Sequence, residues 1–176
     1  MAAPLPYKPT LHRIATMIES GLLLAEHFIP WADARVMSLD APPGWLLELC
    51  TTPDGPSAAR VLYDSAATPP FEPLDEEAQT DDFVACLLLR YRRGDFTWAT
   101  FLQQAGAKLD AANGRRPCEA LYALLTELER REYSTEVERT QRSDVERDFE
   151  AALERVGSLH ATFAANAHEP HPGCQR

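Results

Sequence analysis

The chain has 176 residues, of which 45% are hydrophobic, and its formal net charge at pH 7 is −10. This length suffices for one domain with a buried core, and the apolar content excludes an intrinsically disordered chain. The negative charge repels the phosphates of nucleic acids and anionic membranes, so we expect neither as a partner, whereas a basic protein is attracted.

Helical periodicity recurs along the chain, whereas the sustained alternation of apolar and polar residues that is typical of strands is absent. The first predicted helix spans residues 11–29, with Thr10 as its N-cap. Its apolar positions share one face: Leu11, Ile14, Ile18, Leu22, Ala25 and Ile29. Pro30 is expected to interrupt this helix, because proline lacks a backbone N–H, and a short helix is predicted over residues 31–39.

Two further short helices are predicted from the segments PGWLLELC, residues 43–50, and SAARVLYDSA, residues 57–66. The segment AATPPFEP, residues 66–73, contains three prolines and therefore predicts a connector. We expect a single helical domain over residues 1–176, with a sub-boundary in this connector between the shorter N-terminal and the longer C-terminal helices.

The segment YRRGDFTWATFLQQAG, residues 91–106, is predicted to join two helices. The first covers residues 75–93 and ends at Gly94, a residue that suits a helix stop. Its apolar face contains Val84, Leu87, Leu88 and Tyr91. The tripeptide Arg93-Gly94-Asp95, which adhesion ligands present to integrins, is interpreted as the turn between the two helices.

The second of these helices is expected to begin after Thr97, which serves as its N-cap. Phe96 and Phe101 then occupy the two positions of a hydrophobic staple, in which their side chains pack together. The core face of this helix is predicted to contain Trp98, Leu102, Ala105 and Leu109.

A further helix is predicted after the segment AANGRRPC, residues 111–118. Asn113-Gly114 is expected to stop the preceding helix, and Pro117 to lie in the first turn of the next one. The core face of the new helix is formed by Cys118, Leu121, Leu125 and Leu128.

The last helix is predicted to start at a capping box formed by Ser143 and Glu146. Its buried face contains Val145, Phe149, Ala152, Val156, Leu159 and Phe163. Residues 134–142 are compatible with a second helix start at Thr135 or with a polar connector, and residues 167–176 with a flexible tail. These elements predict an all-α fold, an irregular bundle of about four long helices plus several short ones, without the fixed repeat of a solenoid.

The sequence contains no motif of a known reaction class, so we predict no catalytic residue, no cofactor and no metal site. Its eight glycines form neither G-x-G-x-x-G nor a P-loop, and Glu-x-x-His and His-Glu-x-x-His are absent. The alternative is a helical enzyme or metal-binding protein, because imidazole and thiolate groups are zinc and copper ligands. The residues available to it are His12, His27 and His160, or the tail cluster His168, His171 and Cys174.

The four cysteines, Cys50, Cys86, Cys118 and Cys174, are scattered and form no Cys-x-x-Cys pair. We expect reduced thiols, the first three as small buried residues. The N-terminal segment MAAPLPYKPT lacks the features of a signal peptide, and no apolar run approaches the roughly 20 residues of a membrane span. We therefore predict a cytoplasmic protein; its oligomeric state stays open.

Acidic residues are concentrated between residues 66 and 89, a segment without a single basic side chain. The acids are Glu72, Asp75, Glu76, Glu77, Asp81 and Asp82. Acids at a helix N-terminus interact favourably with the helix dipole, by about 0.3–1 kcal/mol each, and three would suffice for this. A solvated helix start is one interpretation, and an acidic face that binds a basic protein is the other.

The stretch DAPPGWLLELC, residues 40–50, resembles segments of uncharacterised small helical bacterial proteins, some of them associated with toxin–immunity loci. This resemblance implies an immunity-like role and carries no site residue with it. Together with the acidic segment, it leads us to expect a non-enzymatic module that binds a basic protein, such as a toxin-neutralising immunity protein or a small adaptor.

Overall fold

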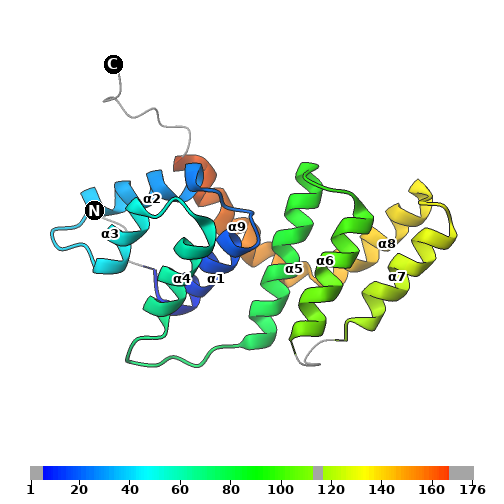
Figure 1. Cartoon of the computed structure of the whole chain (residues 1–176), viewed down its shortest axis with the longest axis horizontal. Helices are drawn as coiled ribbons and strands as arrows, with labels where there is room; N and C mark the ends of the chain where they lie inside the picture. The colour runs from blue at the N-terminus through cyan, green and yellow to red at the C-terminus, as the bar shows by residue number, and fades with distance from the viewer. Residues whose placement is uncertain (1–5, 113–116, 167–176) are drawn as a thin grey trace, which may run out of the picture. The chain divides into compact units, whose positions relative to one another are not determined.

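The computed structural model describes residues 6–112 and 117–166. Within these ranges the chain forms nine α-helices and no strand, which confirms the predicted all-α class (Figure 1). The helices are α1 (Lys8–Glu19), α2 (Ala25–Met37), α3 (Gly44–Thr51), α4 (Gly55–Ala66), α5 (Glu76–Arg93), α6 (Trp98–Ala111), α7 (Glu119–Arg130), α8 (Thr135–Asp148) and α9 (Glu150–Asn166).

The chain divides into two compact units. Unit 1 contains residues 1–73 together with residues 157–176, and unit 2 contains residues 74–156. The first boundary lies at the end of the proline-rich connector 66–73. The second boundary lies inside α9, in a continuous helix where no turn signal marks it in the sequence.

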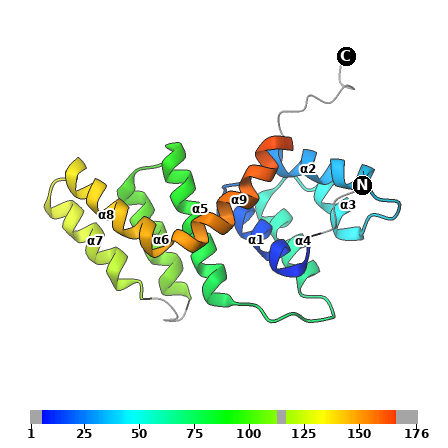
Figure 2. The same cartoon turned by 180° about the vertical axis from the view of Figure 1, so that it is seen from behind.

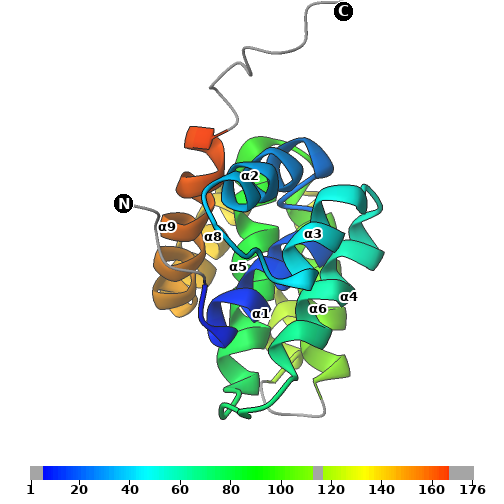
Figure 3. The same cartoon turned by 90° about the vertical axis from the view of Figure 1, so that its left-hand side faces the viewer.

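Unit 1 is built from two helix pairs, α1 with α4 and α2 with α3 (Figure 3). Ile14 of α1 and Leu62 of α4 are fully buried in its core. The part of α9 that belongs to this unit contributes Phe163, whose ring centroid lies 5.0 Å from that of Trp31. Aromatic and aliphatic packing between helices therefore holds the unit together.

The predicted helix over residues 11–29 is wrong, because the chain reverses between α1 and α2. Gly21 adopts φ +75°, a left-handed conformation that ends α1. The amide of Leu23 then donates to the carbonyl oxygen of Met17 at 2.9 Å. Leu22 and Leu23 are both 1% exposed, so the reversal places two adjacent leucines in the core of the unit.

Pro30 lies inside α2 and does not separate two helices, so the predicted helix 31–39 is the second half of α2. The first-turn amides of His27 and Phe28 are satisfied by the carbonyl oxygen of Leu24. A proline six residues into the helix removes only the bond to the carbonyl of Glu26. Burial of Phe28 and Trp31 on either side of the proline favours the helix despite this loss.

Two predicted helix starts differ from the observed ones. The N-cap of α1 is Tyr7 rather than Thr10, with Pro9 in the first turn. Pro117 precedes Cys118, the N-cap of α7, so it lies just before the helix and not in its first turn. Residues 113–116, with the predicted Asn113-Gly114 stop, lie outside the described residues.

Several other local predictions agree with the structure. Helices α3 and α4 coincide with the two predicted short helices, and the side chain of Asp54 caps α4 by accepting from the amide of Ser57. Gly94 adopts φ +88° at the end of α5, and Thr97 accepts from the amide of Thr100 at the start of α6. Phe96 packs against the buried cluster that contains Phe101, as the predicted staple requires.

Unit 2 consists of the adjacent helices α5, α6 and α7, with α8 crossing them on one side, and of the first part of α9, residues 150–156 (Figure 2). A buried polar link fixes this crossing. The indole N–H of Trp98 donates to Oε1 of Gln141 at 3.0 Å, and Nε2 of Gln141 donates to the carbonyl oxygen of Leu124 at 2.9 Å. One side chain of α8 thus bridges α6 and α7.

The predicted start of the last helix at Ser143 is wrong, since Ser143 lies in the interior of α8. Residues 134–142 are helical apart from the N-cap Ser134, and the break between α8 and α9 falls at Phe149. Buried residues continue upstream of the predicted stripe to Gln141, four residues before Val145. This upstream burial extends the helix through the capping-box pattern.

Candidate functional site

The six acidic residues of the predicted partner-binding segment lie on both sides of a unit boundary. Glu72 belongs to unit 1, and the other five belong to unit 2. They have different environments. Glu72 is an exposed residue of the connector, Glu76 and Glu77 are exposed in the first turn of α5, and Asp81 is half-buried further along that helix.

Two of these acids have structural roles within unit 2. Asp75 caps α5 by accepting from the amide of Ala78 at 2.9 Å. Asp82 is only 4% exposed, and its Oδ1 atom accepts from the guanidinium of Arg155 at 2.9 Å. A buried carboxylate with a charged partner belongs to the interior of the protein. The acids best placed to meet a partner are therefore the exposed Glu72, Glu76 and Glu77, together with the half-buried Asp81.

The connector and the residue that follows it, Leu74, also expose large apolar side chains next to these acids in the sequence. Phe71 is 77% exposed and Leu74 is 40% exposed. The ammonium group of Lys8 donates to the carbonyl oxygens of Thr68 and Pro70, so the start of the connector is tied to α1. An anchored segment with an exposed aromatic ring followed in the sequence by carboxylates combines apolar and electrostatic contact groups.

The turn Arg93-Gly94-Asp95 is closed by its own charges. The carboxylate of Asp95 accepts from Arg93 at 2.7 Å and from Arg90 at 3.0 Å. The hydrogen bonds from Arg93, with a smaller contribution from Arg90, lower the pKa of Asp95 to about 2. Both arginines hold this carboxylate, and the turn joins two helices as predicted.

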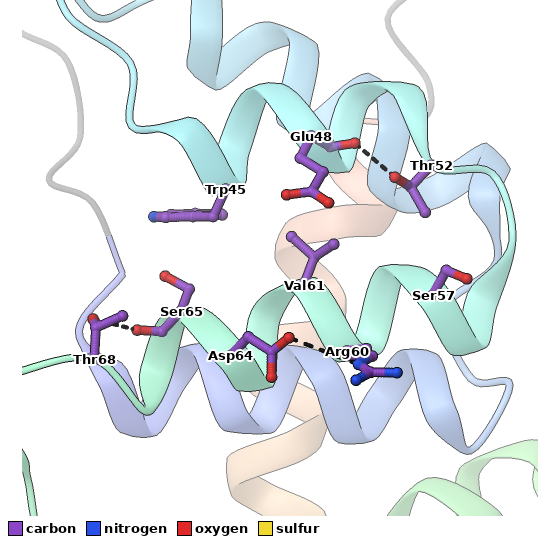
Figure 4. A pocket seen from close by; sticks show the side chains of 9 residues that line it. All are labelled: Trp45, Glu48, Thr52, Ser57, Arg60, Val61, Asp64, Ser65 and Thr68. Carbon is purple, nitrogen blue, oxygen red and sulfur yellow. Dashed lines mark hydrogen bonds and ion pairs between the residues drawn. The ribbon is translucent and has the colours of Figure 1, made fainter.

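A groove of about 620 Å³ lies between α3 and α4 of unit 1 (Figure 4). Its α3 side carries the indole of Trp45 and the carboxylate of Glu48, which point towards α4 from positions one helical turn apart. Val61 rises between them from α4. Arg60 and Asp64, also on α4, form an exposed ion pair across 3.8 Å.

The groove contains one acidic group that lacks an ionic partner among the residues that the structure describes. This group is the exposed carboxylate of Glu48; the half-buried ring of Trp45 likewise has no aromatic or cationic neighbour there. In the sequence, both residues belong to a predicted short helix and to the stretch of residues 40–50, and neither was a predicted site residue. Their spacing, an aromatic and an acid at positions i and i+3 of an otherwise apolar helix, is the sequence feature that could have indicated a binding site. The rest of the groove lies on α4, so this feature alone does not predict the groove.

The histidines of the alternative interpretation have separate local surroundings. The ring of His12 lies 5.5 Å from that of Tyr63, and burial lowers the pKa of His12. His27 accepts the amide of Leu24 through Nδ1 at 3.1 Å. His160 lies on α9. No group of three or more His, Cys, Asp or Glu side chains within the described ranges is arranged to hold a metal ion, and the tail cluster falls outside those ranges.

The described cysteines are free thiols, and Cys86 is buried as predicted, whereas Cys50 and Cys118 are half-buried. Burial raises the pKa of Cys50 to about 11, and the Asp33 carboxylate adds to this effect. Burial, with the charges of Glu119 and Asp110, also raises the pKa of Cys118. These two thiols are therefore protonated at neutral pH, the opposite of what a thiolate nucleophile requires.

None of the described helices combines the length and the apolar character that crossing a membrane would demand. Comparison of the chain with protein-family models, with curated proteins and with solved structures found no match.

Proposed function

We propose that the chain is a non-enzymatic, cytoplasmic module that binds a basic protein, as a toxin-neutralising immunity protein or a small adaptor does. The net charge of −10 attracts such a partner and accelerates encounter. The partner-binding segment runs from Phe71 to Asp81, and its contact acids are Glu72, Glu76, Glu77 and Asp81.

One observation carries this proposal: exposed carboxylates alternate with exposed apolar groups on a short anchored segment. Phe71 and Leu74 supply apolar area, which contributes most of the affinity in protein interfaces. Glu72 and Glu77 supply charge, which contributes to the association rate and to specificity. A merely solvated helix start explains the carboxylates but not the exposed phenylalanine.

The test is a pulldown of the purified chain from its native lysate at low and at raised salt, followed by a binding titration with the captured protein. We expect a basic protein whose affinity falls as salt is raised. A variant with Glu72→Gln, Glu76→Gln, Glu77→Gln and Asp81→Asn should bind at least about tenfold more weakly, mostly through a slower association rate.

The matched control neutralises four exposed acids elsewhere in unit 2: Glu129→Gln, Glu132→Gln, Glu136→Gln and Asp148→Asn. It changes the net charge by the same amount and should retain most of the affinity. Equal losses in the two variants would show that net charge alone drives binding. A Phe71→Ser variant that binds as well as the wild type would remove the aromatic contact from the proposal.

A further inference from the structure

We propose that the groove between α3 and α4 binds an arginine side chain of the basic partner, whose guanidinium stacks on Trp45 and pairs with Glu48. This inference rests on the proposed function, because it assigns a second contact to the same partner. The groove lies in unit 1 and is separate from the acidic segment 71–81.

The geometry of α3 suits a planar cation. Trp45 and Glu48 are three residues apart in a helix, so their side chains lie next to one another on the same face. Figure 4 shows the indole and the carboxylate directed into the same groove, with the aliphatic side chain of Val61 between them. A guanidinium stacked on the ring can therefore reach the carboxylate oxygens, and the apolar stem of the arginine can lie against Val61.

The charges in the groove favour a cationic occupant. Arg60 is already engaged with Asp64, which leaves the carboxylate of Glu48 without a cation within the described part of the chain. An incoming guanidinium neutralises Glu48 and lies near Asp64, so it meets two carboxylates and one basic group. An anionic ligand would be repelled by the two carboxylates and attracted by only one basic group.

Arginine is expected in preference to lysine. Its planar guanidinium stacks on aromatic faces, pairs with carboxylates through two parallel N–H groups, and is less strongly hydrated than an ammonium group. The hydroxyl groups of Ser65 and Thr52, which also line the groove, can accept from the remaining N–H donors.

The groove is continuous along the chain with the connector. Thr68 is both a residue of the groove lining and the residue whose carbonyl oxygen Lys8 holds at the start of the connector. Three residues further, Phe71 is exposed. A partner segment that binds at Trp45 can therefore extend along residues 68–71 to the exposed ring of Phe71, which belongs to the proposed binding segment.

The experiment is an NMR titration of the ¹⁵N-labelled full chain with a short capped peptide containing two arginines separated by glycines. The indole N–H of Trp45 is the reporter, because Trp31 and Trp98 are buried at 4% and 1% exposure. We expect a saturable shift of the Trp45 signal. Binding should be about threefold to fivefold weaker in Glu48→Gln and at least about fivefold weaker in Trp45→Ala, with Asp40→Asn as an exposed-acid control that binds normally.

Four outcomes would overturn the proposal. The first is a shift that does not saturate or is unchanged in Glu48→Gln, a near-isosteric substitution that preserves the fold. The second is equal binding of the matching lysine peptide. The third is equal binding of free arginine amide, which would indicate a small-molecule site. The fourth is a Trp45 shift that depends on the concentration of the chain alone, which would indicate a second copy in the groove.

The outcome is independent of the acidic segment. The variant neutralised at Glu72, Glu76, Glu77 and Asp81 should bind the arginine peptide in the groove as the wild type does. If that variant no longer captures the basic protein but still binds the peptide at Trp45, the acidic segment and the groove act separately. If it still captures the protein but no longer binds the peptide, the two proposals are also distinguished.

Discussion

The two units of the chain use charge in different ways. Unit 1 has 5 basic and 9 acidic residues in its 93 positions, whereas unit 2 has 12 and 18 in its 83, which together make up the 17 and 27 of the whole chain. Ion pairs link neighbouring helices in unit 2: Arg92 of α5 donates to Glu146 of α8 at 3.0 Å. Unit 1 instead exposes apolar groups such as Met37, at 85%, and Phe71, at 77%.

The buried polar side chains of the two units also differ in the hydrogen bonds that they form. In unit 2, Gln141 bonds across three helices, and Asp82 pairs with Arg155 over a long stretch of sequence. In unit 1, the buried hydroxyls of Thr16 and Ser20 bond to carbonyl oxygens of their own helix, and the hydroxyl of Tyr63 on α4 lies 3.3 Å from that of Thr16 and donates to Glu19 of α1 at 2.7 Å. Side-chain hydrogen bonds thus cross the core of unit 2, whereas in unit 1 the Tyr63 hydroxyl makes such a link at the partly exposed edge of the α1–α4 pair, beside a core of apolar side chains.

The largest expected effect is the loss of apolar packing in unit 1. Leu62→Ala removes a fully buried side chain between α4 and α1, and should lower the free energy of unfolding by about 2–5 kcal/mol. Denaturant titration with hydrogen exchange would measure this loss and assign it to unit 1. Leu47→Ala is the control, because Leu47 is 47% exposed and should cost less than about 1 kcal/mol. Similar losses in both variants would contradict a core dominated by α1–α4 packing.

The next effect concerns the polar link of unit 2. Gln141→Met roughly keeps the volume of the side chain but leaves the Trp98 N–H without a partner and removes the additional bond to the Leu124 carbonyl oxygen. We expect a loss of about 1–3 kcal/mol in the free energy of unfolding. Gln104→Met, at an exposed position of α6, should be nearly neutral. A stabilised Gln141→Met variant would mean that apolar packing dominates in both units.

A smaller effect should appear at low pH in the turn after α5. The pKa of Asp95 is about 2 in the folded chain, which is below the ordinary value of 3.8. The stability from its ion pairs is therefore fully present above pH 4 and is lost as the pH falls through 2. Because the site is partly exposed, we expect the wild type to lose about 1 kcal/mol more than Asp95→Asn between pH 4 and pH 2, measured by thermal unfolding. Parallel pH profiles would exclude this contribution.

The smallest effect tests the close approach of α6 and α7. A Cβ atom on Gly106 would lie 2.9 Å from the ring of Tyr122, so Gly106→Ala must displace that ring. The displacement opposes the helix propensity of alanine, and we expect a net loss below about 1 kcal/mol.

In a Tyr122→Ala background the same substitution should be stabilising, by about 0.5–1 kcal/mol, because only the propensity term remains. A double-mutant cycle on the free energy of unfolding gives the interaction between the two positions. Additive effects would show that the ring does not restrict residue 106.

Prediction from the sequence succeeded where a local interaction determines the structure. Gly94 and Thr97 act within one turn of their own position, so the ends of α5 and α6 could be predicted from residue type. It failed where distant packing decides. The reversal at Gly21 places Leu22 and Leu23 in the core, and α2 continues through Pro30 with buried residues on both sides of the proline.

In the candidate sites, too, the features that depend on neighbouring residues could be predicted, and those that depend on distant packing could not. The concentration of acids around Glu76 and Glu77 is visible in the sequence, yet the pairing that removes Asp82 from the surface involves Arg155, 73 residues away. The groove at Trp45 could not be predicted, because half of its lining comes from α4 and depends on how α3 and α4 pack.

The boundary inside α9 has a consequence for biosynthesis. Unit 1 begins with the first part of the chain and is completed only by residues after 156, so unit 2 is an insertion within it. Trp31 leaves the ribosome long before Phe163, the ring it packs against. At 5–20 residues per second, translation of the 83 intervening residues of unit 2 takes roughly 4–17 s. During that interval the earliest helices expose an aromatic face, and the nascent chain depends on its own last helix to cover it.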